Sequence, residues 1–183
     1  MTQRKGVRAL ARISRTRLRA RARRVALVVT DVDGVLTDAG VYYGARGEEL
    51  KRFNVRDGMG VERLRNVGIA TAFLTREKSE CVVARAKKLR LSHVYLGVDD
   101  KLAHLEVILQ TTGLSTGQLA YIGDDVNDLS IMQAVGKDGL TAAPSDAISA
   151  VKAGAIYTCD AAGGHGAFRE FAEWILELRD EPR

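Results

Sequence analysis

Residues 25–38 read VALVVTDVDGVLTD, a short apolar run that ends in closely spaced aspartates. Comparable apolar runs recur further along the chain as IATAFLT at 69–75, HVYLG at 93–97 and LAYIGD at 119–124. Stretches with helical spacing of their apolar residues separate these runs. Short apolar runs bounded by Gly or Asp and separated by periodic helices are typical of βαβ units. The sequence therefore predicts an α/β fold with a doubly wound parallel sheet.

The charge distribution divides the chain into an arm and a body. Residues 1–24 carry ten Lys or Arg and no acid, which predicts a basic arm that is partly helical or disordered. Of the 28 bases in the chain, 18 then remain in residues 25–183 against 23 acids, so the body is acidic. A body of this length with 46% hydrophobic residues in the chain has enough apolar material for one core. We expect a single domain at 25–183.

Composition also limits the partners. The basic arm has no interleaved aromatic residues and is separable from the acidic body, so the sequence does not favour nucleic-acid binding. No apolar run approaches the roughly 18–20 residues that span a bilayer, and no secretory segment precedes the first strand. Cys81 and Cys159 lack the spacing of a disulfide framework or a zinc site. We expect a cytoplasmic protein that does not bind membranes.

Residues 40–53, GVYYGARGEELKRF, interrupt the alternation of strands and helices. Aromatic and apolar residues flank a turn that contains glycine, which predicts an inserted β-hairpin at about 41–53. A small flap of this kind must pack on something, and another subunit is the expected partner.

Acidic and polar residues gather where the predicted strands end. In a parallel sheet these carboxyl ends converge on one crevice. Carboxylates crowded there repel one another unless a cation lies among them, and Mg²⁺ is the expected ion where few carboxylates serve and a phosphate completes its ligands. A hydroxyl and a positive charge in the same crevice then fit a phosphoryl group. The residues are Asp31, Asp33, Thr75, Lys101, Asp124, Asp125 and Asp128.

The spacing of Asp31 and Asp33 predicts how they share the reaction. Residues two apart on an extended segment point the same way, so both side chains reach one phosphate ester. Asp31 is expected to attack phosphorus and form an aspartyl-phosphate. Asp33 is expected to protonate the leaving oxygen and later to take a proton from water. Gly34 lets the chain turn closely under the phosphate.

Taken together, DVDGVLTD at 31–38, Thr75, Lys101 and GDDVND at 123–128 resemble the four motifs of haloacid dehalogenase (HAD) phosphatases. The resemblance is closer still to the branch without a large cap domain, whose members hydrolyse 3-deoxy-D-manno-octulosonate (KDO) 8-phosphate or nonulosonate 9-phosphates such as KDN 9-phosphate. It extends over about residues 18–178 and includes FNVRDGMG, DKLA and GGHGAFREF. It implies a Rossmann-like HAD fold at 25–183 and a phosphomonoesterase of lipopolysaccharide or sialic-acid-type sugar biosynthesis.

The resemblance also implies roles for single residues. Mg²⁺ would be held by the side chain of Asp31, the backbone carbonyl of Asp33 and Asp124, with Asp125 assisting through water. Thr75 and Lys101 would bind the phosphoryl group, and Asp128 would orient its neighbours. Such enzymes form homotetramers in which the hairpin makes the central contact and a C-terminal tail, here about 160–183, caps a neighbouring active site. The residues implied to bind substrate are Thr37, Arg56, Asp57, Gly58, Lys78 and Arg169.

One departure from the family pattern concerns the substrate. The family usually has Gly after the second-motif Thr, whereas this chain has Arg76, which leaves the backbone of that loop in question. Glu77 resembles the nonulosonate 9-phosphate enzymes, which pair such a Glu with basic residues on the next helix. Arg85 and Lys88 lie three apart on one helix face and could supply that pairing. A surface ion pair without a role in specificity is the alternative.

Two other classes of protein share part of the pattern. Receiver modules also combine an acidic Mg²⁺ pocket with Thr and Lys, but they place the phosphorylated Asp after the third strand rather than the first. A non-catalytic HAD-like oligomerisation domain is the second alternative, and the intact catalytic positions argue against it.

Overall fold

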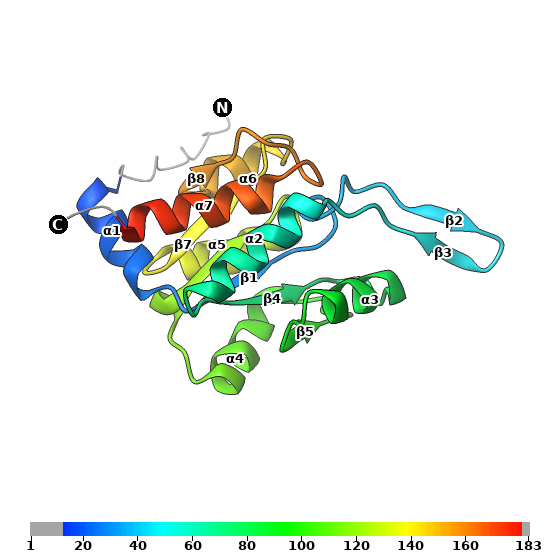
Figure 1. The fold of residues 1–183 in the computed structure, drawn as a ribbon, viewed down its shortest axis with the longest axis horizontal. Helices are drawn as coiled ribbons and strands as arrows, with labels where there is room; N and C mark the ends of the chain where they lie inside the picture. The colour runs from blue at the N-terminus through cyan, green and yellow to red at the C-terminus, as the bar shows by residue number, and fades with distance from the viewer. Residues whose placement is uncertain (1–12, 181–183) are drawn as a thin grey trace, which may run out of the picture.

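The computed structural model of the protein describes residues 13–180. Its centre is a sheet of six parallel strands in the order β5-β4-β1-β6-β7-β8 (Figure 1). The chain begins in the middle of the sheet at β1 and fills one side before the other, which is the predicted doubly wound topology. The strands are β1 Leu27–Thr30, β4 Ala70–Leu74, β5 His93–Tyr95, β6 Leu119–Ile122, β7 Leu140–Ala143 and β8 Tyr157–Thr158.

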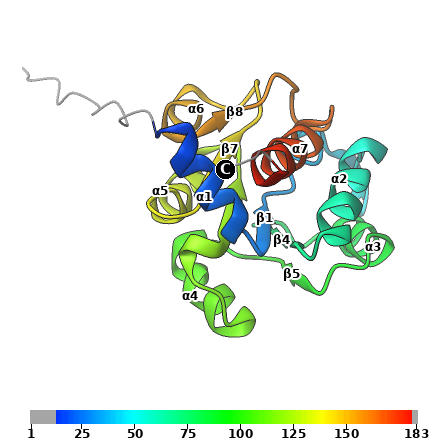
Figure 2. The same ribbon diagram turned by 60° about the vertical axis from the view of Figure 1, so that its left-hand side comes forward.

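Helices cover both faces of this sheet (Figure 2). Alternate strand residues bury their side chains on opposite faces: Val28 packs with α2 and α7, and Val29 packs with α4 and α5. No helix within residues 13–180 has the length and apolar character needed to cross a membrane. The helices are α1 Arg15–Arg24, α2 Val55–Asn66, α3 Glu80–Lys88, α4 Lys101–Thr112, α5 Leu129–Gly136, α6 Ser149–Gly154 and α7 Ala167–Asp180, with short 3-10 turns η1 Thr116–Gln118 and η2 Val126–Asp128.

The predicted hairpin is confirmed. Strands β2, Tyr42–Gly44, and β3, Gly47–Leu50, form a separate antiparallel ribbon that projects from the body of the molecule (Figure 1). It is inserted between β1 and α2, and the described residues form no separate cap domain. Large apolar side chains remain uncovered on the ribbon: Tyr42 is 61% exposed, Tyr43 73% and Leu50 63%.

The basic arm is attached to the body more firmly than its charge suggests. Residues 1–12 of the predicted arm lie outside the described residues. Helix α1 packs against α7 and buries Ala22 completely. Arg21 donates hydrogen bonds to three carbonyl oxygens at the end of α5 and beyond, and Arg179 donates to the carbonyls of Ala22, Arg23 and Val25. The boundary expected after residue 24 therefore falls inside one packed unit.

The segment expected to be a C-terminal tail, about 160–183, is part of the core as far as residue 180. Helix α7 buries Phe168, Phe171 and Ile175 against the sheet and packs along α2. The loop before it lies against the chain that follows β1, where the Gly164 amide donates to the carbonyl of Val35 at 2.9 Å. The apolar side chains of α7 therefore cover one face of the sheet, and the capping of a neighbouring active site by this segment stays a prediction.

Candidate active site

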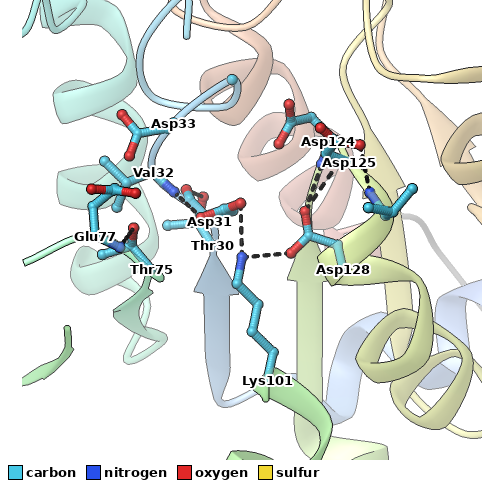
Figure 3. Close-up of polar contacts among 12 residues, drawn as sticks. Thr30, Asp31, Val32, Asp33, Thr75, Glu77, Lys101, Asp124, Asp125 and Asp128 are labelled. Atoms are coloured by element: carbon cyan, nitrogen blue, oxygen red, sulfur yellow. Dashed lines mark hydrogen bonds and ion pairs between the residues drawn. The ribbon is translucent and has the colours of Figure 1, made fainter. Parts of the chain in front are cut away.

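Three neighbouring strands bring the predicted catalytic residues to one edge of the sheet. Asp31 follows β1 at the centre, Thr75 follows β4 on one side, and Asp124 follows β6 on the other (Figure 3). Strand β1 pairs with β4 as far as Thr30 and Phe73, and with β6 as far as Thr30 and Ile122. The carboxyl ends of the three strands therefore lie at nearly the same level. The sheet order alone explains why residues far apart in sequence meet here.

Lys101 joins the two ends of the acidic group. Its ammonium lies 2.7 Å from Asp31 Oδ2 and 2.7 Å from Asp128 Oδ1, and its side chain is fully buried (Figure 3). Burial would lower the pKa of Lys101, but the charges of Asp31 and Asp128 outweigh it and raise that pKa. Tyr121, which the sequence did not single out, donates its hydroxyl to Asp128 Oδ1 at 2.6 Å. Lys101 is thus a fixed positive charge beneath Asp31.

Asp31, Asp124 and Asp128 each offer an oxygen within 4.8 Å of the others. Burial, and then repulsion from Asp128, raise the pKa of Asp31 well above its usual range. The same two causes raise the pKa of Asp124 to about 7. Asp124 Oδ1 is buried and has no hydrogen-bond partner among the described residues. Crowded carboxylates with an unused buried oxygen fit a hard divalent cation such as Mg²⁺.

Asp125 is next to Asp124 in the sequence, but its side chain is engaged in capping the η2 turn. Its side chain accepts the Val126 amide and caps η2, while its own amide donates to Asp128 Oδ2 at 3.3 Å. The Asp124 amide donates to the same oxygen at 2.9 Å. Asp128 therefore orders the GDDVND loop and also belongs to the three-carboxylate group, whereas the expected assistance of Asp125 through water stays a prediction.

Asp33 is held from the hairpin side by a residue that the sequence did not single out. The Lys51 ammonium donates to Asp33 Oδ1 at 2.5 Å, and the Thr37 hydroxyl lies 3.5 Å from the same oxygen. Burial opposes the charge on Lys51, but Asp33 and Glu48 together raise the pKa of Lys51. Lys51 follows β3 and reaches Asp33 across eighteen positions of sequence, so only the folded hairpin reveals this pair.

The loop after β4 adopts a compact turn without the glycine that the family usually has. The Glu77 amide donates to the buried Thr75 hydroxyl oxygen at 3.1 Å. Arg76 does not have a positive φ and pairs with Asp99 at the surface, so the backbone here accepts a side chain. Glu77 is exposed near Thr75 (Figure 3), and the Lys78 side chain lies against Gly97.

The other predicted substrate residues form a second group, on α2, α3 and α7, and no described contact joins it to the aspartates. Asp57 is buried and accepts the Arg169 amide at 2.9 Å. The Arg169 side chain pairs with Glu173. Arg85 donates to the carbonyl of Asn54 and shows no ion pair with Glu77.

Three further members of the predicted substrate set lie on the same part of the molecule. Arg56 is exposed on α2. Gly58 and Lys88 line a separate hollow of about 210 Å³. The added Cβ of a residue at Gly58 would lie 2.7 Å from Arg85, so this glycine permits the close approach of α2 and α3.

Comparison with known proteins gives a consistent result. No protein-family model matches the chain. The chain is 40% identical over 161 residues to the 3-deoxy-D-manno-octulosonate 8-phosphate phosphatase KdsC of Yersinia pestis, covering 88% of this chain and 84% of that protein. The Moraxella catarrhalis phosphatase of the same name, solved in complex with magnesium, phosphate and KDO, is 35% identical with a TM-score of 0.83, over 89% of this chain and 92% of that one.

A third similar structure is a putative HAD superfamily (subfamily III A) hydrolase from Legionella pneumophila, with a TM-score of 0.84 and 36% identity over 90% of this chain and 89% of that one. The parallel sheet, the aspartates at its strand ends and these relatives define a phosphatase of the HAD superfamily without a large cap domain. Within it, the chain belongs to the family of 3-deoxy-D-manno-octulosonate 8-phosphate phosphatases. Neither the receiver reading nor the non-catalytic reading is favoured by these relatives.

Proposed function

We propose that this enzyme hydrolyses KDO 8-phosphate to KDO and phosphate through an aspartyl-phosphate on Asp31. The observation that carries the proposal is the position of Asp31, which is buried at the end of β1 and bridged by Lys101 to Asp128. A nucleophilic carboxylate next to a fixed ammonium and a carboxylate cluster suits attack on a phosphate ester. The similarity to KDO 8-phosphate phosphatases supports the choice of substrate.

In the proposed reaction, an oxygen of Asp31 forms a bond to phosphorus while the bond from phosphorus to the sugar oxygen breaks. Asp33 gives its proton to that oxygen, so the sugar acid leaves as an alcohol. Asp33 then takes a proton from water, which attacks phosphorus and releases phosphate from Asp31. Lys101 and Thr75 bind the phosphoryl oxygens, and Thr37 helps to hold the loop of Asp33.

Mg²⁺ is the proposed cofactor. Asp31, Asp124 and the backbone carbonyl of Asp33 would hold it, with Asp125 assisting through water and Asp128 ordering the loop. When bound, the ion supplies positive charge that offsets the charge of the phosphate ester and of the carboxylates. The raised pKa values of Asp31 and Asp124 support a cation at this place.

A nonulosonate 9-phosphate is the second candidate substrate, and Glu77 is the observation that favours it. Its carboxylate is exposed beside Thr75, where it can accept hydrogen bonds from hydroxyl or amide groups of a longer sugar acid. A ligand that places its own carboxylate there would be disfavoured by repulsion. Arg85 and Lys88 are the proposed basic partners of Glu77, and Lys78 the proposed contact on the same loop.

We also propose a cytoplasmic homotetramer in which the projecting hairpins meet. Exposed aromatic side chains on the ribbon, including Tyr42 and Tyr43, support this contact, since apolar patches of this kind mark interaction sites. In such an assembly Arg56 and Arg169 are the proposed ligands of the sugar-acid carboxylate, and Asp57 with Gly58 shapes the helix that carries Arg56.

The test is a phosphate-release assay with KDO 8-phosphate and a nonulosonate 9-phosphate side by side at matched Mg²⁺. We expect a higher kcat/KM on KDO 8-phosphate, and the reverse order would favour the second candidate. Asp31→Asn is expected to abolish turnover, because an amide cannot form the acyl phosphate, and to leave the melting temperature close to that of the wild type. Substantial remaining activity in Asp31→Asn would reject Asp31 as nucleophile.

A further inference from the structure

Each aspartate of the DVD segment has its own buried lysine. Lys101, at the start of α4, forms an ion pair with Asp31, and Lys51, at the end of the hairpin, forms an ion pair with Asp33. The Lys51 side chain is fully buried although it follows an exposed ribbon. Burying a flexible ammonium is unfavourable unless it has partners, so its two ion pairs account for its position.

The partners of Lys51 continue as a polar chain away from the catalytic loop. The Lys51 ammonium lies 3.3 Å from Glu48 Oε2 on β3. The other oxygen of Glu48 accepts the hydroxyl of Ser79, which is buried and caps the N-terminus of α3. The Cys81 thiol lies near the carbonyl of Glu49 and adds a second contact between β3 and α3. The hairpin base is thereby joined to the loop that carries Thr75.

The two carboxylate oxygens of Asp33 have different surroundings. Oδ1 accepts Lys51 at 2.5 Å and Thr37 at 3.5 Å. Oδ2 is buried and has no hydrogen-bond partner among residues 13–180. A carboxylate fixed through one oxygen keeps the other at a defined place, which proton transfer to or from a reacting group requires.

We propose that Lys51 is a positioning residue, which fixes the Asp33 carboxylate through Oδ1 so that Oδ2 is presented to the leaving group. The hairpin therefore takes part in the reaction as well as projecting from the domain. The inference rests on the proposed role of Asp33 as the acid and base, and it adds the residue that sets the geometry of that step.

The experiment compares Lys51→Met and Lys51→Arg with the wild type on two substrates, KDO 8-phosphate and p-nitrophenyl phosphate. The sugar alkoxide is a poor leaving group that needs its proton, whereas p-nitrophenolate leaves readily without one. Lys51→Met is expected to lose about tenfold to hundredfold in kcat/KM on the sugar phosphate, the effect of one charge-assisted hydrogen bond, and much less on the aryl phosphate. The ratio kcat/KM reports departure of the leaving group and excludes the later hydrolysis of the aspartyl-phosphate, in which Asp33 takes part for both substrates. Lys51→Arg is expected to recover part of the loss, since it retains a charged donor.

A double-mutant cycle with Asp33→Asn distinguishes positioning from a general structural effect. If Lys51 acts through Asp33, Lys51→Met adds little further loss in the Asp33→Asn background. Equal losses in kcat/KM on both substrates, or losses in kcat/KM that multiply in the double variant, would overturn the proposal. If wild-type enzyme released no phosphate from either substrate, the proposed function itself would fail, which is a separate outcome.

Two further variants protect the test against misfolding. Lys87→Met removes an exposed lysine on α3 and is expected to match the wild type in activity and melting temperature. Glu48→Gln removes the negative charge of the second ion-pair partner of Lys51 and leaves Asp33 unchanged. If Lys51→Met does not fold, Glu48→Gln is expected to show the same preference for the aryl phosphate with a smaller loss, and an unchanged substrate ratio in Glu48→Gln would reject the proposal.

Discussion

Gly34 has a φ of +82° and lies directly against Asp124. A Cβ at this position would come within 2.0 Å of Asp124 Oδ2. Gly34→Ala is therefore expected to displace a proposed Mg²⁺ ligand and to weaken Mg²⁺ binding by about tenfold to hundredfold. The measurement is the rise in melting temperature as Mg²⁺ is added, which reports binding without requiring turnover.

Gly68→Ala is the matched control for this substitution. Gly68 has nearly the same φ, +80°, but an added Cβ there meets nothing within 4 Å. Both variants carry the cost of a left-handed alanine, roughly 1–2 kcal/mol. Only Gly34→Ala is expected to change the Mg²⁺ dependence, and an equal change in both would attribute the effect to backbone strain.

Asp57 makes stability depend on pH. Burial raises the pKa of this carboxyl to about 6 in the folded protein, so ionisation is less favourable there than in the unfolded chain. The contribution of Asp57 to stability is fully present below its unfolded pKa, near 4, and is lost as pH rises through about 6. A shift of about 2 units corresponds to at most about 3 kcal/mol.

Asp57→Asn is expected to flatten this part of the stability profile. Urea unfolding at pH 4, 5, 6 and 7 should show the wild type losing more stability than the variant across that window. Asp99→Asn, at an exposed ion pair, serves as the control. Parallel profiles for wild type and Asp57→Asn would contradict the assignment.

The residues at the strand ends could be predicted because a parallel sheet dictates where they meet. Asp31, Lys101 and Asp128 were found in this way, and the structure brings them within hydrogen-bonding distance. Lys51 and Tyr121 were not found, because their partners depend on how the hairpin folds back and on which way one strand residue faces. Neither Lys51, which follows β3, nor Tyr121, within β6, has a local sequence pattern that sets it apart from its neighbours.

At the scale of elements, arginine side chains connect α1 to the rest of the domain. Arg21 donates to the carbonyls of Gly136, Lys137 and Gly139, where α5 ends. Carbonyl oxygens at the end of a helix and just beyond it lack partners within that helix, and the Arg21 guanidinium supplies donors to these three. Arg21→Met is expected to reduce the free energy of unfolding by about 1–2 kcal/mol.

Chemical denaturation of Arg21→Met and Arg17→Met tests this connection. Arg17 is exposed one turn earlier on the same face of α1, so its replacement changes the charge equally. A similar loss in both variants would show that the charge of the helix matters and the α5 contact does not.

Helix α7, within the segment expected to be a C-terminal tail, has a sequence that itself predicts a buried helix. Phe168, Phe171, Ala172 and Ile175 follow the spacing of one helix face, and all four are fully buried. This periodicity predicts burial of one helix face, whereas the capping of a neighbouring active site rests on the resemblance alone. The hairpin, by contrast, was predicted from its glycine turn and flanking aromatic residues, which are local signals.

At the scale of the whole molecule, the exposed ribbon is the proposed contact between copies of the enzyme. Tyr43→Glu places a charge at the most exposed aromatic position of the hairpin and is expected to lower the mass of the assembly in solution. Light scattering after size-exclusion chromatography measures that mass. Val107→Glu, an apolar-to-acidic change on the exposed side of α4, is the control. Unchanged mass in Tyr43→Glu would exclude the hairpin as the contact.

The glycines before α7 lie against the catalytic loop so closely that a Cβ on Gly163 would reach within 2.0 Å of the Gly34 carbonyl. Asp31 precedes Gly163 and Gly164 by a long stretch of sequence, so protein synthesis makes it well before them. A growing chain holds its proposed nucleophile, Asp31, before it holds the backbone that lies against the loop around it. A chain that stops before Gly163 is therefore expected to leave the loop of Asp31 and Asp33 without this backbone support.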